Sequence, residues 1–216
     1  IEDSFLENND GNGILLSNNA TSDITSTIIN GNGGSGAYII ASTASFVDCS
    51  FDFNETGVVD LSDGTIFYNS TFNNNVANGL TFNSNPSGNI SDCTFNNNGG
   101  AGMYSINSSP NIDNSTFFNN QNSGISRAGD GDLTINSCLF ENNVGSNGGG
   151  IIINASSNSD NINIENSTFR QNQAIGVVDD WDGSISGGFG GAIYNFSDKD
   201  ILIKNCLIEQ NSAMIG

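Results

Sequence analysis

The sequence predicts an all-β fold, a parallel β-helix solenoid with three short strands in each coil. Three observations lead to this prediction. An FxxN unit recurs nine times in the 216 residues, with Ile replacing Phe in two copies, at a period of about 22 residues. Small and aliphatic residues stand in fixed columns around each unit, and a Gly-led apolar segment follows most copies. A β-sandwich, the competing all-β architecture, would not place these residue types in strict columns.

The FxxN segment is the first predicted strand of each coil. Its apolar anchors, each followed by Asn three residues later, are Phe5, Ile29, Phe51, Phe72, Phe95, Phe117, Phe140, Phe169 and Ile208. Because the Asn residues recur at the same place in every coil, they should stack as a ladder joined by their side-chain amides. The predicted ladder contains Asn54, Asn75, Asn98, Asn120, Asn143, Asn172 and Asn211. We expect its role to be structural.

The second predicted strand precedes the anchor. Aliphatic residues lie seven and five positions before it, as in Leu133 and Ile135, and a small Ser or Cys lies two positions before it. These apolar positions cannot share one face of a straight strand, because strand side chains alternate between faces. A corner must therefore intervene. The residue three before the anchor is Asp or Asn in six copies, and both tolerate a left-handed backbone.

The third predicted strand follows FxxN and begins with Gly. Its copies are "NGILL" 12–16, "SGAYII" 35–40, "NGLTF" 78–82, "AGMYS" 101–105, "SGIS" 123–126, "GGGIII" 148–153 and "GGAIY" 190–194. Three short strands and three turns in each period make one coil of a solenoid, stacked on the next at about 4.8 Å. The expected domain organisation is a single segment, 1–216, of about nine coils that is open at both ends.

The four cysteines occupy the small inward column in alternate coils, at Cys49, Cys93, Cys138 and Cys206. Neighbours in the column are then about 9–10 Å apart by the coil spacing, which is too far for a disulfide. We therefore expect four buried free thiols. The sequence has no His and no C-x-x-C pair, so a cysteine metal site is not expected either.

The combination of FxxN with GGA-aliphatic motifs resembles a known repeat. "GGAI" 190–193 matches it literally, whereas "GGAGM" 99–103 and "GGGI" 148–151 are degenerate copies. The chain is similar to the polymorphic outer-membrane protein repeat of chlamydial surface proteins. More broadly, it resembles the right-handed parallel β-helix of the pectin-lyase-like superfamily. The resemblance implies a right-handed coil and a role in surface display or adhesion.

The last two anchor intervals, of 29 and 39 residues, contain insertions. The longer one predicts a lateral loop over 173–190 that holds Trp181 together with Asp179, Asp180 and Asp182. "DWDG" has the beginning of a calcium loop but lacks the downstream bidentate Glu of an EF-hand. These three aspartates are the candidate metal ligands, and calcium is the only candidate cofactor. A solvated acidic loop that packs its Trp against the coil is the alternative.

Nine N-x-S/T triplets are candidate glycosylation sites. Several arise from the repeat itself, because the corner residue is often Asn and Thr often precedes the anchor. Modification requires a eukaryotic secretory pathway. The candidate acceptors are Asn19, Asn54, Asn69, Asn89, Asn107, Asn114, Asn154, Asn166 and Asn195.

The charge balance disfavours several classes of partner. The chain has 23 acidic and 4 basic residues and a formal net charge of −19. Nucleic acids and anionic membranes bind basic surfaces, so neither is expected as a partner. No apolar run is long enough for direct membrane insertion. The four basic residues do not share a column and no recurring carboxylate pair forms a glycosidase dyad, so we expect that the chain is not an enzyme.

These inferences predict a structural or adhesive component of a secreted or cell-surface stalk, fibre or filament. It would act outside the cell or at its surface as a rigid rod that presents lateral loops. Neither end shows a capping helix, so the expected partners are further coils of the same or an identical chain stacked end to end. The cell-surface ligand is unspecified. The alternative is a polysaccharide-binding or polysaccharide-cleaving β-helix.

Overall fold

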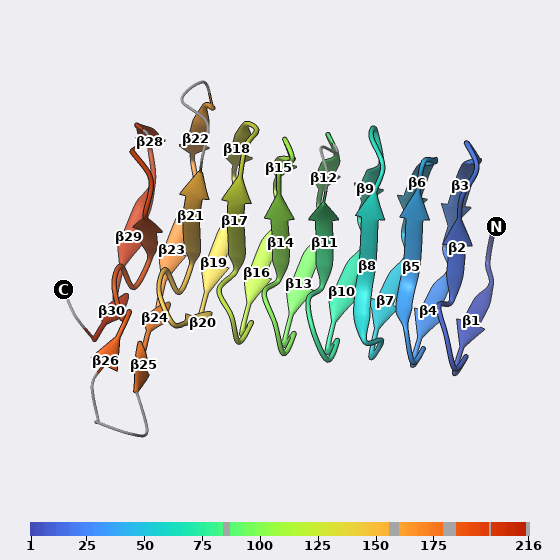
Figure 1. Cartoon of the computed structure of the whole chain (residues 1–216), viewed down its shortest axis with the longest axis horizontal. Coiled ribbons are helices and arrows are strands. Elements are labelled where there is room, and N and C mark those ends of the chain that lie inside the picture. The colour runs from blue at the N-terminus through green and yellow to red at the C-terminus, as the bar shows by residue number, and fades with distance from the viewer. Residues whose placement is uncertain (84–86, 156–159, 179–184, 199, 215–216) are drawn as a thin grey trace.

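Three parallel sheets run the length of the molecule and enclose its core (Figure 1). The structure is a computed structural model and describes residues 1–83, 87–155, 160–178, 185–198 and 200–214. Successive coils lie side by side along the long axis, with the two termini at opposite ends. The predicted β-helix is confirmed, and the coil is right-handed. No helix in the described part of the chain has the length and hydrophobicity to cross a bilayer.

The anchor sheet carries the FxxN units and has nine strands. They are β1 Phe5–Glu7, β4 Ile28–Asn30, β7 Ser50–Asp52, β10 Thr71–Asn73, β13 Thr94–Asn96, β16 Thr116–Phe118, β19 Leu139–Glu141, β23 Thr168–Arg170 and β29 Leu207–Glu209. The Gly-led sheet has eight strands. They are β2 Ile14–Leu16, β5 Ser35–Ile40, β8 Thr56–Leu61, β11 Leu80–Asn83, β14 Met103–Ile106, β17 Ile125–Gly129, β21 Ile151–Ala155 and β27 Ile193–Asn195.

The third sheet precedes the anchors and also has eight strands. They are β3 Thr21–Thr25, β6 Thr43–Val47, β9 Ile66–Tyr68, β12 Asn89–Ser91, β15 Asn111–Asp113, β18 Leu133–Asn136, β22 Ile162–Glu165 and β28 Ile201–Lys204. Short strands β20 Val144–Gly145, β24 Gln173–Ala174 and β30 Ser212–Ala213 pair beside the last coils. The predicted lateral loop contains the antiparallel pair of β25 Val177–Val178 and β26 Ile185–Ser186.

The core contains a continuous stack of Phe rings from the anchor sheet. Ring centroids of Phe72 and Phe95 are 4.6 Å apart, those of Phe95 and Phe117 4.6 Å, and those of Phe117 and Phe140 4.8 Å. The planes in these pairs differ by 5° or less. Parallel β pairing places identical residues above one another at the coil spacing, so each ring covers the next. Every coil thus buries its apolar surface against its neighbours.

The predicted Asn ladder is confirmed. The Asn98 amide Nδ2 donates to the Phe72 carbonyl at 2.9 Å and to Asn120 Oδ1 at 2.9 Å. Its Oδ1 accepts from the backbone N–H and the Nδ2 of Asn75, at 3.1 and 3.0 Å. The same pattern continues through Asn143 and Asn172. Each amide therefore joins three coils and satisfies buried backbone groups at the turn.

Corners with a left-handed backbone form two columns, of which the sequence predicted one. The expected corner three residues before the anchor is present, as at Asp48 with φ 56° and Asn69 with φ 47°. A second column lies two residues after the anchor, as at Asn74 with φ 56° and Asn97 with φ 55°. The Asn runs after each Phe contained this second signal. The sequence prediction assigned a structural role only to the last Asn of each run, the ladder residue.

The sequence alignment of the first coil was wrong by one residue. Leu6, not Phe5, pairs with Ile29 in the anchor column. Asn9, not Asn8, donates its side chain to Asn32 Oδ1, at 2.8 Å. A shift of one residue exchanges the two faces of a strand, so Phe5 faces outward with 69% of its surface exposed. Leu fills the inward position in this coil, where two adjacent apolar residues made the register ambiguous.

All four cysteines are free, as predicted, and three are buried. The Cys93 thiol donates to the Ser91 carbonyl at 3.2 Å, and burial raises its pKa to about 12. Burial likewise raises the pKa of Cys138 to about 12. Cys206 is only half-buried, because it belongs to the last coil of the described residues and is covered on one side.

Candidate functional site

The candidate calcium ligands Asp179, Asp180 and Asp182 lie outside the described residues. Seven of the nine candidate glycosylation sites are exposed, and Asn195 is half-buried. Asn54 is the exception. Its side chain is buried in the ladder, where Nδ2 donates to the Ile29 carbonyl at 2.9 Å. In the folded chain the Asn54 amide nitrogen is therefore not accessible at the surface.

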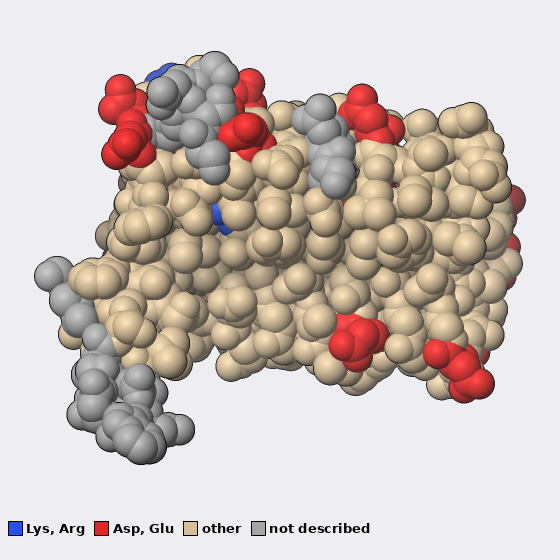
Figure 2. All heavy atoms as spheres, in the orientation of Figure 1, with Lys and Arg blue, Asp and Glu red and all other residues tan. Residues whose placement is uncertain are grey.

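Acidic side chains gather at one corner of the last coils, between the Gly-led sheet and the third sheet. We call this group the acidic corner, and it consists of Asp130, Asp132, Asp160, Asp198 and Asp200. Figure 2 shows acidic side chains concentrated at this end of the visible face. Strand register explains the grouping. Leu133 pairs with Ile162 and Ile162 with Ile201, so the residues just before these strands lie in neighbouring coils.

Hydrogen bonds hold the acidic corner to its scaffold. Asp132 Oδ1 accepts from the backbone N–H of Asn161 at 2.7 Å and from its Nδ2 at 3.2 Å. The backbone N–H of Asp132 in turn donates to Ser109 Oγ at 3.1 Å. The corner therefore continues a turn ladder from coil to coil, and the Asp132 carboxylate is attached to a rigid stack.

A buried arginine lies directly behind this corner. Arg127 belongs to β17 and occupies the inward position that is Ile153 in the next coil. Its guanidinium donates to the carbonyls of Ala128 and Gly129, both at 2.7 Å, and to that of Gly131. Its Nη2 also lies 3.6 Å from Asp160 Oδ2. Burial lowers the pKa of Arg127, and the nearby carboxylate of Asp160 opposes that shift.

Asp160 connects this buried cation to the surface. Its side chain is 6% exposed, and Oδ2 accepts no hydrogen bond from the described residues. It lines a pocket of 520 Å³ together with Asn161, Asn163, Asp198 and Asp200. Asp160 is paired with Arg127, whereas Asp198 and Asp200 are exposed to solvent.

This arrangement can support acid–base chemistry by carboxyl groups. Asp160 and Asp200 belong to adjacent coils, and the strand register places Asp200 beside Asn161, the residue after Asp160. Glycosidases use a pair of carboxyl groups that flank the bond they cleave. Within the described ranges, no three His, Cys, Asp or Glu side chains converge closely enough to hold a metal ion.

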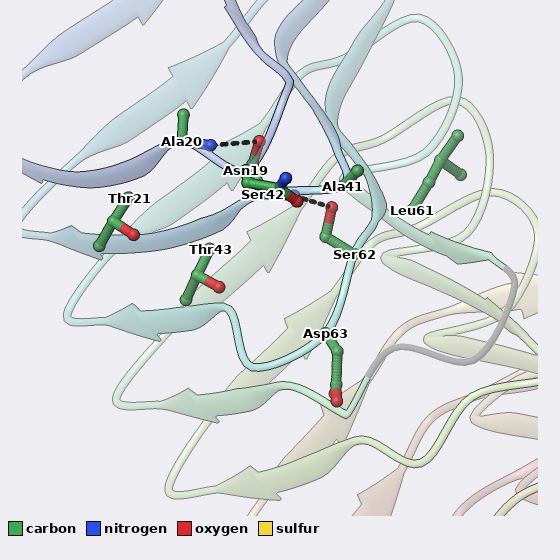
Figure 3. Close-up of a pocket in the computed structure, with 9 residues that line it drawn as sticks. All are labelled: Asn19, Ala20, Thr21, Ala41, Ser42, Thr43, Leu61, Ser62 and Asp63. Atoms are coloured by element: carbon green, nitrogen blue, oxygen red, sulfur yellow. Dashed lines mark hydrogen bonds between the residues drawn. The ribbon is translucent and has the colours of Figure 1, made fainter.

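A second pocket, of 380 Å³, lies at the equivalent corner near the N-terminal end (Figure 3). Its hydroxyl groups serve the scaffold. Ser42 Oγ accepts from the backbone N–H of Ala20 at 3.2 Å, and Ser62 Oγ accepts from that of Ser42 at 3.1 Å. Asp63 is its single carboxylate and is bonded to Ser87. This pocket has no pair of ionisable groups, so the acidic corner is the stronger candidate.

The sequence did not indicate the acidic corner. A signal was nevertheless present in two sequence columns, because Asp132 and Asp200 lie eight residues before their anchors and Asp130 and Asp198 lie ten before theirs. Asp160, nine residues before Phe169, falls in neither column. Arg127 shares no sequence column with another basic residue. The alternation of β17 contained the missed signal, because Arg127 is two residues after the inward Ile125 and must share its face.

Comparison with known proteins supports the fold. A family model described as "Right handed beta helix region" matches residues 1–134 and 107–215. The crystal structure of the Agl-KA catalytic domain superposes with a TM-score of 0.64 at 14% identity, covering 99% of this chain and 44% of that one. The periplasmic alginate epimerase AlgG superposes with a TM-score of 0.51 at 10% identity, covering 87% of this chain and 58% of that one. No curated protein sequence matches.

These comparisons correct one expectation. The chain spans about half the length of the two structures, and both are enzymes. The prediction that the chain is not an enzyme is therefore contradicted, because both structurally similar proteins carry out catalysis on this architecture. A column of basic residues is not required for catalysis, since paired carboxyl groups can act without one.

Proposed function

This chain belongs to the right-handed β-helix family, and on that premise we propose that it binds and hydrolyses a neutral polysaccharide at the acidic corner. The observation that carries the proposal is the position of Asp160. It is an almost fully buried carboxylate, paired with the buried Arg127, at the wall of a pocket that also presents Asp198 and Asp200. Polar and charged groups that converge on one pocket in this way are typical of binding sites.

The charge of the molecule supports a neutral substrate. The net charge is −19, and a polyuronate would be repelled. The three basic side chains of the described residues are already paired with acids. Arg170 lies 2.9 Å from Glu141, Lys204 3.6 Å from Glu165, and Arg127 3.6 Å from Asp160. None of them is left to bind an anionic sugar.

The mechanism that we propose is hydrolysis with retention of configuration by two carboxyl groups that line one pocket. Asp160 attacks the anomeric carbon while Asp200, as the general acid, donates a proton to the departing glycosidic oxygen. Water then attacks the glycosyl-enzyme bond, gives its proton back to Asp200 and releases Asp160 as a carboxylate. Arg127 is a positioning residue in this scheme, because it holds Asp160 through the ion pair and touches no sugar.

A panel of polysaccharides tests the proposal. Neutral glucans, mannans, xylans and galactans would be incubated with the chain beside polygalacturonate and alginate, and new reducing ends would be measured. We expect release from at least one neutral polymer and none from the two polyuronates. Proton NMR of the first product would show the anomer of the substrate. Release from the polyuronates alone, or from no polymer, would contradict the proposal.

A role as a rigid extracellular or cell-surface rod is a second candidate, favoured by the continuous Asn ladder and Phe stack. One of the structurally similar enzymes is periplasmic, which agrees with a site of action beyond the cytoplasm. Ile203 and Ile208 are exposed core-type residues of the last described coil. A further coil stacked on them would bury this apolar surface, which supports end-to-end partners. Sedimentation velocity over a concentration series would show such assembly.

A further inference from the structure

A row of aromatic side chains lies on the outer face of the Gly-led sheet, beside the acidic corner. We call Phe189, Tyr194 and Phe196 the aromatic platform. The ring centroids of Phe189 and Tyr194 are 5.6 Å apart with planes 19° apart, and those of Tyr194 and Phe196 are 6.1 Å apart with planes 27° apart. Phe196 is 67% exposed and Phe189 38%. Three neighbouring rings thus present an apolar surface to solvent.

The backbone beneath the platform is fixed. The Phe189 N–H donates to Asn147 Oδ1 at 3.1 Å, and the Phe189 carbonyl accepts from Gly148 N–H at 2.9 Å. The Phe196 N–H donates to the Ile153 carbonyl at 2.8 Å. The backbone that carries the Phe189 and Phe196 rings is therefore hydrogen-bonded to the previous coil. Such preorganisation lowers the entropy lost when a ligand binds.

The platform is continuous with the acidic corner. Its three rings, with Asn147 and Asn154, line a pocket of 280 Å³. Phe196 and Asp198 line an adjoining pocket of 470 Å³, and Asp198 also lines the acidic pocket with Asp160 and Asp200. From Phe196 to Asp200 the chain can reach at most about 14 Å, a length that a short oligosaccharide spans.

We propose that the aromatic platform is a binding subsite for neutral pyranose units of the polysaccharide chain. Exposed apolar surface bordered by polar groups marks a binding site. The flat faces of pyranose rings carry C–H groups that pack on aromatic faces, while the amides of Asn147 and Asn154 are placed to bind hydroxyl groups. A nucleic acid or an acidic sugar would meet the same rings but would be repelled by the adjoining aspartates.

This inference rests on the proposed function and names where the unreacted part of the substrate binds. Its test uses the whole chain produced in bacteria, so that no glycan is attached at Asn154 or Asn195. The Asp160→Asn variant prevents hydrolysis, and calorimetry then measures its binding to oligosaccharides of each neutral polymer. Tyr194→Ala and Phe196→Ala are compared in that background with Phe5→Ala. Phe5 is a matched control, being 69% exposed at the opposite end of the molecule.

Each platform substitution should weaken binding by about tenfold, and the control substitution should leave it unchanged. Circular dichroism and thermal unfolding would show that the variants are folded. Binding that is insensitive to both platform substitutions, or no binding of any neutral oligosaccharide, would overturn the inference. Platform-dependent binding by a wild-type chain that hydrolyses no polymer would uphold the subsite and contradict only the proposed hydrolysis.

Discussion

The Asn ladder gives the most direct prediction about stability, and Asn98 is its central test. In the Asn98→Ala variant, three buried groups lose a partner: the Phe72 carbonyl, the backbone N–H of Asn75 and one hydrogen of the Asn75 amide. Asn120 Oδ1 keeps the backbone N–H of residue 98, at 3.3 Å, and is not left unpaired. The variant therefore isolates a defined set of broken hydrogen bonds.

The expected loss follows from that count. A buried polar group that loses its partner costs about 1 kcal/mol or more, so three of them cost about 3–4 kcal/mol. Whole domains are stable by only about 5–15 kcal/mol, so the loss should be large. Urea unfolding followed by circular dichroism measures it. Asn122→Ala is the control, because Asn122 is exposed and lies outside the ladder. A loss below about 1 kcal/mol for Asn98→Ala would refute the account of the ladder.

Three further predictions concern buried ionisable groups. Burial raises the pKa of Asp60 to about 6 from its ordinary 3.8, so the folded chain binds this proton more tightly than the unfolded chain. The contribution of the protonated Asp60 to the free energy of unfolding is therefore fully present below about pH 4. It is lost as the pH rises through 6, and the loss is roughly 3 kcal/mol. In urea unfolding, the Asp60→Asn variant should have the same free energy of unfolding as the wild type at pH 4 and a larger one above pH 6. Equal free energies of unfolding at pH 7 would contradict this prediction. A thiol reagent at pH 8 should modify only Cys206 in the folded chain and all four cysteines in urea; fast native labelling of Cys93 would count against the buried column. Arg127→Met should lower the free energy of unfolding by about 3 kcal/mol in the wild-type chain and by at least 1 kcal/mol less in the Asp160→Asn background. Additive effects of the two substitutions would show that the ion pair contributes nothing to stability.

The repeat allowed most of the scaffold to be predicted from sequence. Columns of Phe and Asn recur because each coil must turn and fill its interior in the same way, so a period alone locates the ladder and the corner before each anchor. The register cannot be predicted from the period where two adjacent residues are both apolar. Phe5 and Leu6 are both apolar and adjacent, and only the packing of the next coil decides that Leu6 points inward.

The candidate site was not predictable in the same way. Four aspartates of the acidic corner fall in two sequence columns, Asp132 with Asp200 and Asp130 with Asp198. Asp160 shares neither column, and strand register brings it to the same corner. The aromatic platform likewise combines Phe189, which precedes β27, with Tyr194 within it and Phe196 just after it. Both depend on pairing between distant segments, which a repeat analysis aligned on the anchors does not resolve.

The central claim is that Asp160 acts in the hydrolysis of a neutral polysaccharide. The rate of reducing-end release by two variants tests this claim most directly. Asp160→Asn removes the carboxylate beside Arg127, whereas Asp63→Asn removes the single carboxylate of the other corner pocket. On a polymer that the wild type cleaves, Asp160→Asn should lower the rate on the order of a thousandfold, with its fold intact. Asp63→Asn should retain the wild-type rate. Equal rates for the two variants would contradict the assignment of the acidic corner as the catalytic site.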